Sequence, residues 1–181
     1  MHMAKYRGSS LPVLVVLLPL LLQATVPSPS PGTIVPGVGV EGLLKLGIFS
    51  AEIKSLKDRY SLKDSPLPTF LRRDGGKQII DYAQFGLRLV VNKEAIELIV
   101  VLAPTVTVGG RKIPLITTRG ISVGSPEKRV LSLYGLPPTP TKVAGGEILY
   151  YSCIGFDVSA DTHLVRAILV FAQQDRRPCA R

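Results

Sequence analysis

The stretch YAQFGLRLVVNKEAIELIVVLA, Tyr82 to Ala103, decides the expected fold because a second stretch follows the same pattern. That second stretch is YSCIGFDVSADTHLVRAILVFA, Tyr151 to Ala172, and the two align without a gap. Tyrosine meets tyrosine, glycine meets glycine, and both end in alternating aliphatic runs typical of strands. Both faces of each final run are apolar, which suits a strand covered on both sides or one whose second face meets a partner. We therefore expect one hairpin in each half of the chain.

Charged residues occupy equivalent places in the two hairpins. A two-residue loop at Asn92-Lys93 would place Arg88 opposite Glu97, and the same register places Asp157 opposite Arg166. Opposite charges that face each other across strands stabilise a sheet by about 0.2–1 kcal/mol. Because the two pairs carry reversed polarity, we predict structural roles for all four residues and catalytic roles for none.

A short helix is predicted upstream of each hairpin. In VGSPEKRVLSLYGLPP (residues 123–138), Ser125 is a suitable N-cap, Pro126 suits the first helical position and Gly135 suits the end. In LGIFSAEIKSLK (residues 46–57), Ser50 is the equivalent cap. The predicted fold class is therefore α+β, with two tandem helix-plus-antiparallel-sheet units and the helices packed on one sheet face.

The helical stretch also resembles a family signature, which it matches at Gly124, Val130, Gly135 and Pro137. The signature is that of small outer-membrane assembly lipoproteins of the BamE (SmpA/OmlA) type, and it is similar to the repeat of secreted β-lactamase inhibitory proteins. In the first copy only Gly47 and Ile53 match. The resemblance implies a helical layer on an antiparallel sheet and a protein that binds other proteins without chemistry of its own. The lipid-bearing cysteine of the lipoproteins is missing near the apolar N-terminal run.

The N-terminal segment has the form of a secretory signal. Lys5 and Arg7 precede an uncharged run from Leu11 to Leu22, which is shorter than the about 20 apolar residues of a spanning helix. Cleavage after Ala24 or after Gly32 fits this segment, and an uncleaved membrane anchor is the alternative. We therefore predict a periplasmic or secreted protein.

Proline-rich and glycine-rich stretches mark the boundaries between the predicted segments of the chain. The stretch TVPSPSPGTIVPG is too rich in proline to pack a core, and Gly109-Gly110 marks a turn between the two halves. The predicted segments are a signal peptide (residues 1–24), a Pro-rich linker (25–40), a first α+β repeat (41–104), a connecting hairpin (105–117), a second α+β repeat (118–173) and a disordered tail (174–181).

Two cysteines, Cys153 and Cys179, allow two interpretations. An exported protein can form a disulfide between them. We favour two unpaired thiols, because Cys179 lies in the tail QQDRRPCAR, whose composition is typical of a disordered end.

The net charge of +9 favours anionic partners. Basic doublets such as Arg111-Lys112 lack the interleaved aromatic residues of single-strand nucleic-acid binding surfaces, and an exported protein does not meet nucleic acid in the cytoplasm. If these doublets bind a partner, anionic lipids or acidic glycans are the partners to expect, but we favour a merely solvated surface.

No catalytic, cofactor or metal site is predicted. Gly37, Gly39 and Gly42 spell G-x-G-x-x-G, but PSPSPG is too proline-rich to be the strand that precedes a dinucleotide-binding turn. Ser159, Asp161 and His163 fall in one expected hairpin loop, whereas a catalytic triad converges from separate elements. Cysteine and histidine do not show metal-ligand spacing.

The sequence therefore predicts a non-catalytic, exported binding or scaffolding protein of the cell envelope or extracellular space, whose partner is another envelope protein. The expected binding surface is an open sheet face formed around Tyr82 and Tyr151, with Arg111 and Lys112 as further candidates. Two alternatives stay open: an extracytoplasmic hydrolase, and a basic module for anionic lipid or glycan surfaces.

Overall fold

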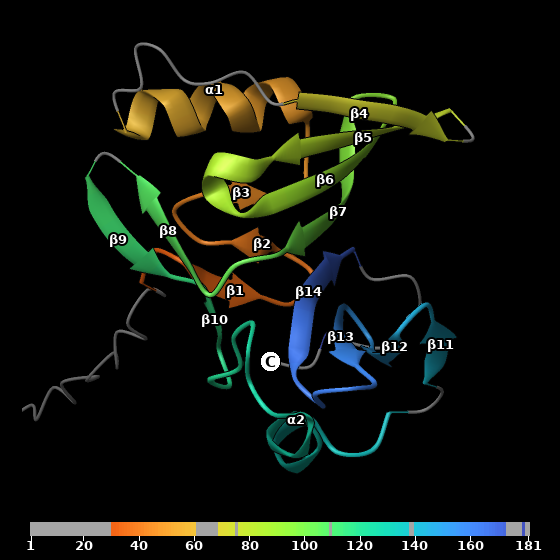
Figure 1. The fold of residues 1–181 in the computed structure, drawn as a ribbon. Coiled ribbons are helices and arrows are strands. Elements are labelled where there is room, and N and C mark those ends of the chain that lie inside the picture. The colour runs from red at the N-terminus through yellow and green to blue at the C-terminus, as the bar shows by residue number, and fades with distance from the viewer. Residues whose placement is uncertain are drawn as a thin grey trace, which may run out of the picture.

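The computed structural model describes residues 30–60, 69–74, 76–108, 110–137, 140–172 and 179. These residues are mostly β-structure, with strands β1 to β14 arranged in three sheets. Two α-helices occur among them, α1 (Phe49–Tyr60) and α2 (Glu127–Tyr134), together with the short 3-10 helix η1 (Ala83–Phe85). Figure 1 shows α1 and α2 at opposite ends of the described structure.

An eight-stranded antiparallel sheet forms the frame, in the order β11-β12-β13-β14-β7-β6-β5-β4. Its strands are β4 (Thr69–Asp74), β5 (Lys77–Tyr82), β6 (Leu87–Asn92), β7 (Ala95–Val101), β11 (Thr141–Val143), β12 (Gly146–Tyr151), β13 (Ile154–Ser159) and β14 (Val165–Phe171). The two hairpins expected from the sequence are β6–β7 and β13–β14, and β7 pairs with β14 in the middle of the sheet.

Two smaller sheets complete the fold. The first, in the order β10-β1-β2-β3, contains β1 (Thr33–Val35), β2 (Gly39–Val40), β3 (Leu44–Lys45) and β10 (Ile116–Thr117). The second is a hairpin of β8 (Thr105–Val108) and β9 (Arg111–Pro114), as expected around Gly109-Gly110. Residues 33–40 therefore differ from the linker predicted for 25–40, because Ile34 and Val40 are fully buried and a turn after Pro36 folds β2 back on β1.

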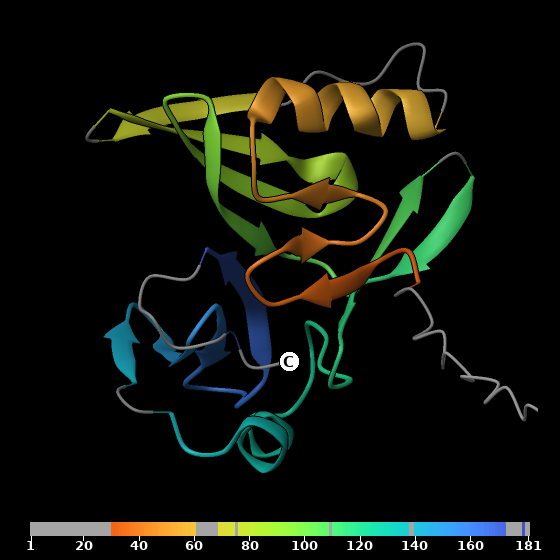
Figure 2. The ribbon, with the colours of Figure 1, turned by 180° about the vertical axis from the view of Figure 1, so that it is seen from behind.

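One face of the eight-stranded sheet carries the core. The buried residues Leu87, Val101 and Ile168 lie in register across three neighbouring strands. The small sheet packs on this face, since a Cβ added at Gly39 would lie 3.3 Å from Ile99 Cδ1. Figure 2 shows β1, β2 and β3 in front of the larger sheet when the molecule is seen from behind. We call this side the covered face.

The predicted fold class is wrong. Strands of both halves form one continuous sheet, and further sheets lie beside it, so the described chain is mostly β-structure and not two tandem helix-plus-sheet units. The reason is the pairing of β7 with β14, which lets apolar strands from both halves share one core. Sequence periodicity identifies such strands but does not identify their neighbours.

The register of the first hairpin also differs from the prediction. Asn92 pairs with Ala95, so the turn is Lys93-Glu94, one residue later than expected. A bulge between Val90 and Val91 shifts the register further and places Arg88 opposite Val100. The predicted Arg88–Glu97 pair is therefore wrong.

The Lys93-Glu94 turn leads to a prediction. Both residues have positive φ, 45° and 68°, which a two-residue hairpin turn requires and which Asn-Gly adopts most readily. The double substitution Lys93→Asn, Glu94→Gly is expected to raise the free energy of unfolding by about 1 kcal/mol, because it relieves backbone strain. Urea denaturation measures this change.

Ala160→Gly provides the matched control for this turn. Ala160 follows β13 in another hairpin loop and does not itself have a positive φ, so glycine there only adds freedom to the unfolded chain. We expect this variant to lose about 0.5–1 kcal/mol. If the Lys93→Asn, Glu94→Gly variant instead lost as much free energy of unfolding as Ala160→Gly, the strain argument would be contradicted.

Candidate functional site: the open face of the sheet

The second face of the eight-stranded sheet carries half-buried apolar side chains. Val100 and Leu169 lie opposite each other on β7 and β14, and so do Leu98 and Phe171. Because directly opposite residues share a face, these four side chains form its centre. The face continues onto Val90 and Tyr150. We call the surface formed by Val90, Leu98, Val100, Tyr150, Leu169 and Phe171 the open face.

Two aromatic rings lie on the open face and contact each other. The ring centroids of Tyr150 and Phe171 are 6.1 Å apart, with an interplanar angle of 65°. This edge-to-face arrangement is a favourable one for aromatic pairs. Half-exposed aromatic residues surrounded by aliphatic ones are typical of the energetic centres of protein interfaces.

The charged residues beside the open face form ion pairs with one another. Lys77 Nζ lies 2.7 Å from Glu97 Oε2, and Arg88 Nη2 lies 3.6 Å from Asp81 Oδ2. Hydrogen bonds from Lys77 and from the Asn92 amide lower the pKa of Glu97. The two ion pairs therefore neutralise the charges of these four side chains.

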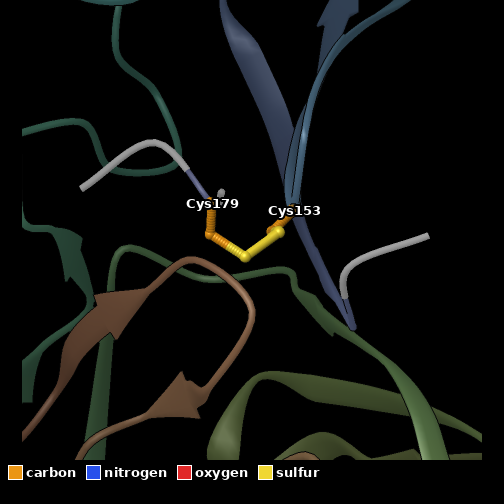
Figure 3. The surroundings of a disulfide bond; sticks show 2 residues. All are labelled: Cys153 and Cys179. Carbon is orange, nitrogen blue, oxygen red and sulfur yellow. A yellow bond between two sulfur atoms is a disulfide. The ribbon is translucent and has the colours of Figure 1, made fainter. Parts of the chain in front are cut away.

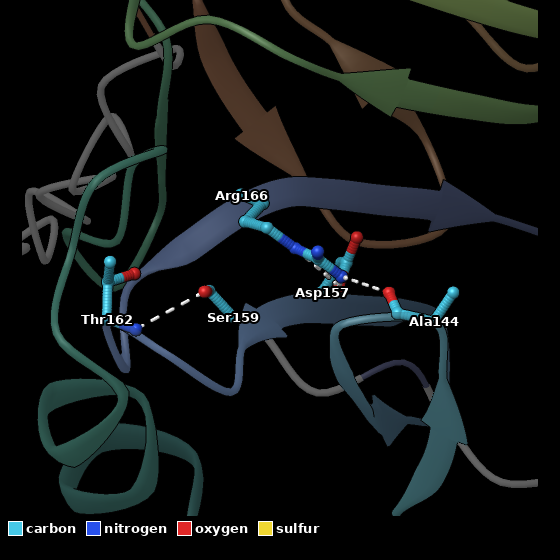
Figure 4. A network of polar contacts seen from close by, with 5 residues as sticks. All are labelled: Ala144, Asp157, Ser159, Thr162 and Arg166. Atoms are coloured by element: carbon cyan, nitrogen blue, oxygen red, sulfur yellow. Dashed lines mark hydrogen bonds and ion pairs between the residues drawn. The ribbon is translucent and has the colours of Figure 1, made fainter.

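The third pair is the one predicted between Asp157 and Arg166. Arg166 Nη2 donates to Asp157 Oδ1 at 2.6 Å and also contacts the carbonyl oxygen of Ala144 at 3.4 Å, as Figure 4 shows. A bulge after Asp157 places it opposite Ala167, but the long arginine side chain spans the shift. Asp157 and Arg166 therefore link β13, β14 and the turn before β12, so their role is structural.

The two tyrosines predicted as binding residues do not lie on the open face. Tyr82 is 1% exposed on the covered face, and its ring stacks on Phe85 with centroids 4.7 Å apart. Tyr151 pairs with the buried Ile154, and its hydroxyl donates to the carbonyl oxygen of Gly135 at 2.7 Å. Burial raises the pKa of Tyr151, so its phenol stays protonated near neutral pH. The predicted surface residues are core and helix-anchoring residues instead.

The other two predicted surface residues lie elsewhere. Arg111 and Lys112 are exposed on β9, in the separate two-stranded sheet, and they make no ion pair with the described residues. A second basic doublet, Lys128-Arg129, lies on α2, which both views place away from β9. The described doublets therefore do not gather into one basic surface.

The Ser159 and His163 loop has a structural explanation. Ser159 Oγ accepts a hydrogen bond from the Thr162 backbone N–H at 3.3 Å (Figure 4). His163 lies on an exposed turn with its side chain 72% exposed, and its Nδ1 lies 2.8 Å from Glu127 Oε2 at the start of α2. The imidazole therefore joins a turn to a helix and does not lie in the deep pocket that we expect for a hydrolase dependent on His163.

The glycine motif also has a structural explanation. Gly37, Gly39 and Gly42 have positive φ and lie in the turns and strands of the small sheet. A dinucleotide-binding turn would lead directly into a helix, whereas this motif leads into β3. Among the described residues, no group of three histidine, cysteine or acidic side chains is placed to hold a metal ion. In the same part of the chain, neither helix is long and apolar enough to cross a membrane.

Cys153 and Cys179 form a disulfide, so the prediction of two unpaired thiols is wrong. Their Cα atoms lie 5.3 Å apart, and the bond closes a sequence separation of 26 residues. Figure 3 shows the bond between Cys153, in the turn that precedes β13, and Cys179, beside the β1–β2 turn. A Cβ at Gly37 would lie 2.5 Å from Cys179 Sγ, so this turn packs directly on the bond.

Comparison with known proteins gives only distant structural similarity. No family model matches the chain, and no curated protein matches it. One similar structure is a cysteine-rich secretory protein from Staphylococcus aureus subsp. aureus Mu50, with TM-score 0.43, 15% identity, and coverage of 79% of this chain and 48% of that one. Another is an extracellular protein containing a SCP domain from Bacillus anthracis str. Ames, with TM-score 0.44, 10% identity, and coverage of 83% and 49%. The chain spans about half the length of both.

The fold corrects the family resemblance. The expected relation to BamE-type lipoproteins and β-lactamase inhibitory proteins is wrong, because the described chain is mostly β-structure, with strands of both halves in one sheet and no helical layer on two tandem units. The motif around Gly124 and Gly135 has a local cause, since it surrounds α2 and Gly135 ends this helix with a φ of 80°. Short helices in unrelated folds share such a pattern.

Proposed function

We propose that this chain is an exported, non-catalytic binding or scaffolding protein that contacts another folded protein through the open face. The observation that carries the proposal is the open face itself. It presents apolar side chains in register across the middle strands of a wide sheet. A contiguous apolar surface of this kind on a soluble protein marks an interaction site more often than it marks plain solvent exposure.

Export is supported by the N-terminal charge and apolar pattern together with the disulfide. Lys5, Arg7 and the uncharged Leu11–Leu22 run form the pattern of a secretory signal. A structural disulfide persists in oxidising compartments. Fusion of residues 1–32 to a reporter enzyme that is active only after export tests this part of the proposal. Reporter activity equal to that of a fusion without these residues would contradict it.

Contact through the open face is tested by site-specific photo-cross-linking in cells of the source. A photoreactive residue at Leu98 is expected to give a discrete cross-linked product, because the Leu98 side chain lies at the centre of the open face. The matched control carries the same residue at Lys112, which is exposed on β9. Products at Lys112 and none at Leu98 would instead favour the basic module for anionic surfaces. No product at either position would contradict the proposal.

A further inference from the structure

We propose that a second surface of this chain, at the end of α2, binds an anionic lipid surface. It consists of two leucines that enter the lipid, Leu133 and Leu136, and of three basic side chains that contact the headgroups, Arg119, Lys128 and Arg129. We call these five residues the α2 tip. The proposal is independent of the contact through the open face, because α2 packs against the buried ring of Phe156 on the covered face.

The two leucines are exposed although the backbone that carries them is fixed. Leu136 is 86% exposed, more than any other large apolar side chain that the structure describes, and Leu133 is 39% exposed. Arg119 Nη1 donates to the carbonyl oxygen of Leu133 at 2.6 Å, and the hydroxyl of Tyr151 donates to the carbonyl oxygen of Gly135 at 2.7 Å. The chain therefore holds both leucines in solvent at set positions, which lowers the entropic cost of inserting them elsewhere.

Basic side chains lie directly beside these leucines. Arg129 precedes Leu133 by one helical turn, so the two residues are neighbours on the same face of α2. The guanidinium of Arg129 also reaches back to the loop before the helix, since a Cβ added at Gly120 would lie 3.3 Å from its Nη2. Arg119, the neighbour of Gly120, reaches the carbonyl oxygen of Leu133, so two guanidinium groups flank the exposed apolar side chain.

Acidic residues do not compensate this positive charge. Lys128 and Arg129 are exposed and make no ion pair with the described residues. Glu127 is the acidic residue of α2, and its carboxylate contacts His163 at the beginning of the helix, away from Leu136. The α2 tip therefore differs from the open face, where the charged residues form ion pairs with one another, and it attracts an anionic partner.

The size and position of the α2 tip favour lipid over a folded protein. The helix has eight residues, and both views place it at the lower end of the described structure, beyond the strands (Figures 1 and 2). Five side chains are far fewer than the about 20–30 residues that each partner contributes to a stable protein interface. A lipid surface adapts to a small projecting tip, and a few apolar side chains together with basic ones support weak, reversible binding.

The test is co-sedimentation of the soluble exported protein with vesicles of phosphatidylglycerol and phosphatidylcholine in equal parts, and with vesicles of phosphatidylcholine alone. We expect binding to the anionic vesicles that about 0.5 M salt largely removes. Leu136→Ser should weaken this binding about tenfold, because the leucine no longer transfers into the lipid. The double substitution Lys128→Gln, Arg129→Gln should weaken it on the order of tenfold, because each basic residue adds attraction to the anionic surface.

Matched controls make the same changes elsewhere. Ile48→Ser alters an apolar residue that is 60% exposed beside α1, and Arg111→Gln with Lys112→Gln removes the same number of charges from β9. Both controls should bind within about twofold of the wild type, because neither site lies near the α2 tip. All these substitutions change exposed side chains, so the midpoint of thermal unfolding should stay that of the wild type.

Several outcomes would overturn the proposal. These are absence of binding to the anionic vesicles, equal binding to the neutral vesicles, and equal losses in the variants and their controls. A loss confined to the basic variant would mean contact with an acidic surface without insertion, and this result also refutes the lipid contact. In cells, a photoreactive residue at Leu136 should give lipid adducts, whereas a discrete protein product there would contradict the assignment. The Leu98 cross-link tests the open face separately from all these outcomes.

Discussion

Removal of the Cys153–Cys179 disulfide by the double substitution to serine is expected to lower the free energy of unfolding by about 3 kcal/mol. The bond closes a separation of 26 residues, and the loss follows because the unfolded chain regains the entropy of that loop. The midpoint of thermal unfolding should fall by about 10 °C for a chain of this size. Urea denaturation and calorimetry measure the two quantities.

A second substitution tests whether the β1–β2 turn packs on the bond. Gly37→Ala is expected to destabilise the wild type strongly, because its Cβ meets Cys179 Sγ and its φ is +73°. In the double-serine background the tail is free to move, so the cost should fall towards the about 1 kcal/mol of the backbone conformation alone. The same cost in both backgrounds would contradict the packing, and unchanged stability without the disulfide would contradict its role as a staple.

Truncation of Phe156 to alanine is expected to lower the free energy of unfolding by about 3–5 kcal/mol. Phe156 is fully buried, and its ring centroid lies 4.9 Å from that of Tyr134 on α2 and 5.9 Å from that of Tyr151 on β12. The substitution leaves a cavity beneath the helix. Urea denaturation measures the loss, and amide hydrogen exchange of α2 should report loosening of the helix.

Phe171→Ala is the matched control, because it removes the same ring from the opposite face of the neighbouring strand. Phe171 is half-buried on the open face, so we expect a loss of about 1 kcal/mol in the monomer. Measurements at several protein concentrations separate this loss from any effect of association. Similar losses at both positions would show that the assignment of covered and open faces is wrong.

Much of the local structure could be predicted from the sequence. The two hairpins, the β8–β9 hairpin and the span of α2 lie close to where periodicity and turn residues placed them. The aliphatic faces of β7 and β14 also indicated strands that are apolar on both sides. These features depend on contacts between near neighbours in sequence, which local patterns report.

The register of charged residues was predictable only in part. The Asp157–Arg166 pair occurs as expected, because the long arginine side chain tolerates a bulge. The Arg88–Glu97 pair does not, because a turn shifted by one residue and a bulge move Arg88 opposite Val100. A small shift in register changes every cross-strand partner, and residue types alone do not reveal it.

By itself the sequence determined the strands of the hairpins β6–β7, β8–β9 and β13–β14, the approximate span of α2, and that an export pattern precedes them. Only the tertiary structure decided that β7 pairs with β14, that Tyr82 is buried whereas Phe171 is half-exposed, and that Cys179 reaches Cys153. The physical reason is distance along the chain. Alternation shows that a strand has two faces, but the choice of the face that becomes the core depends on which distant segment covers it.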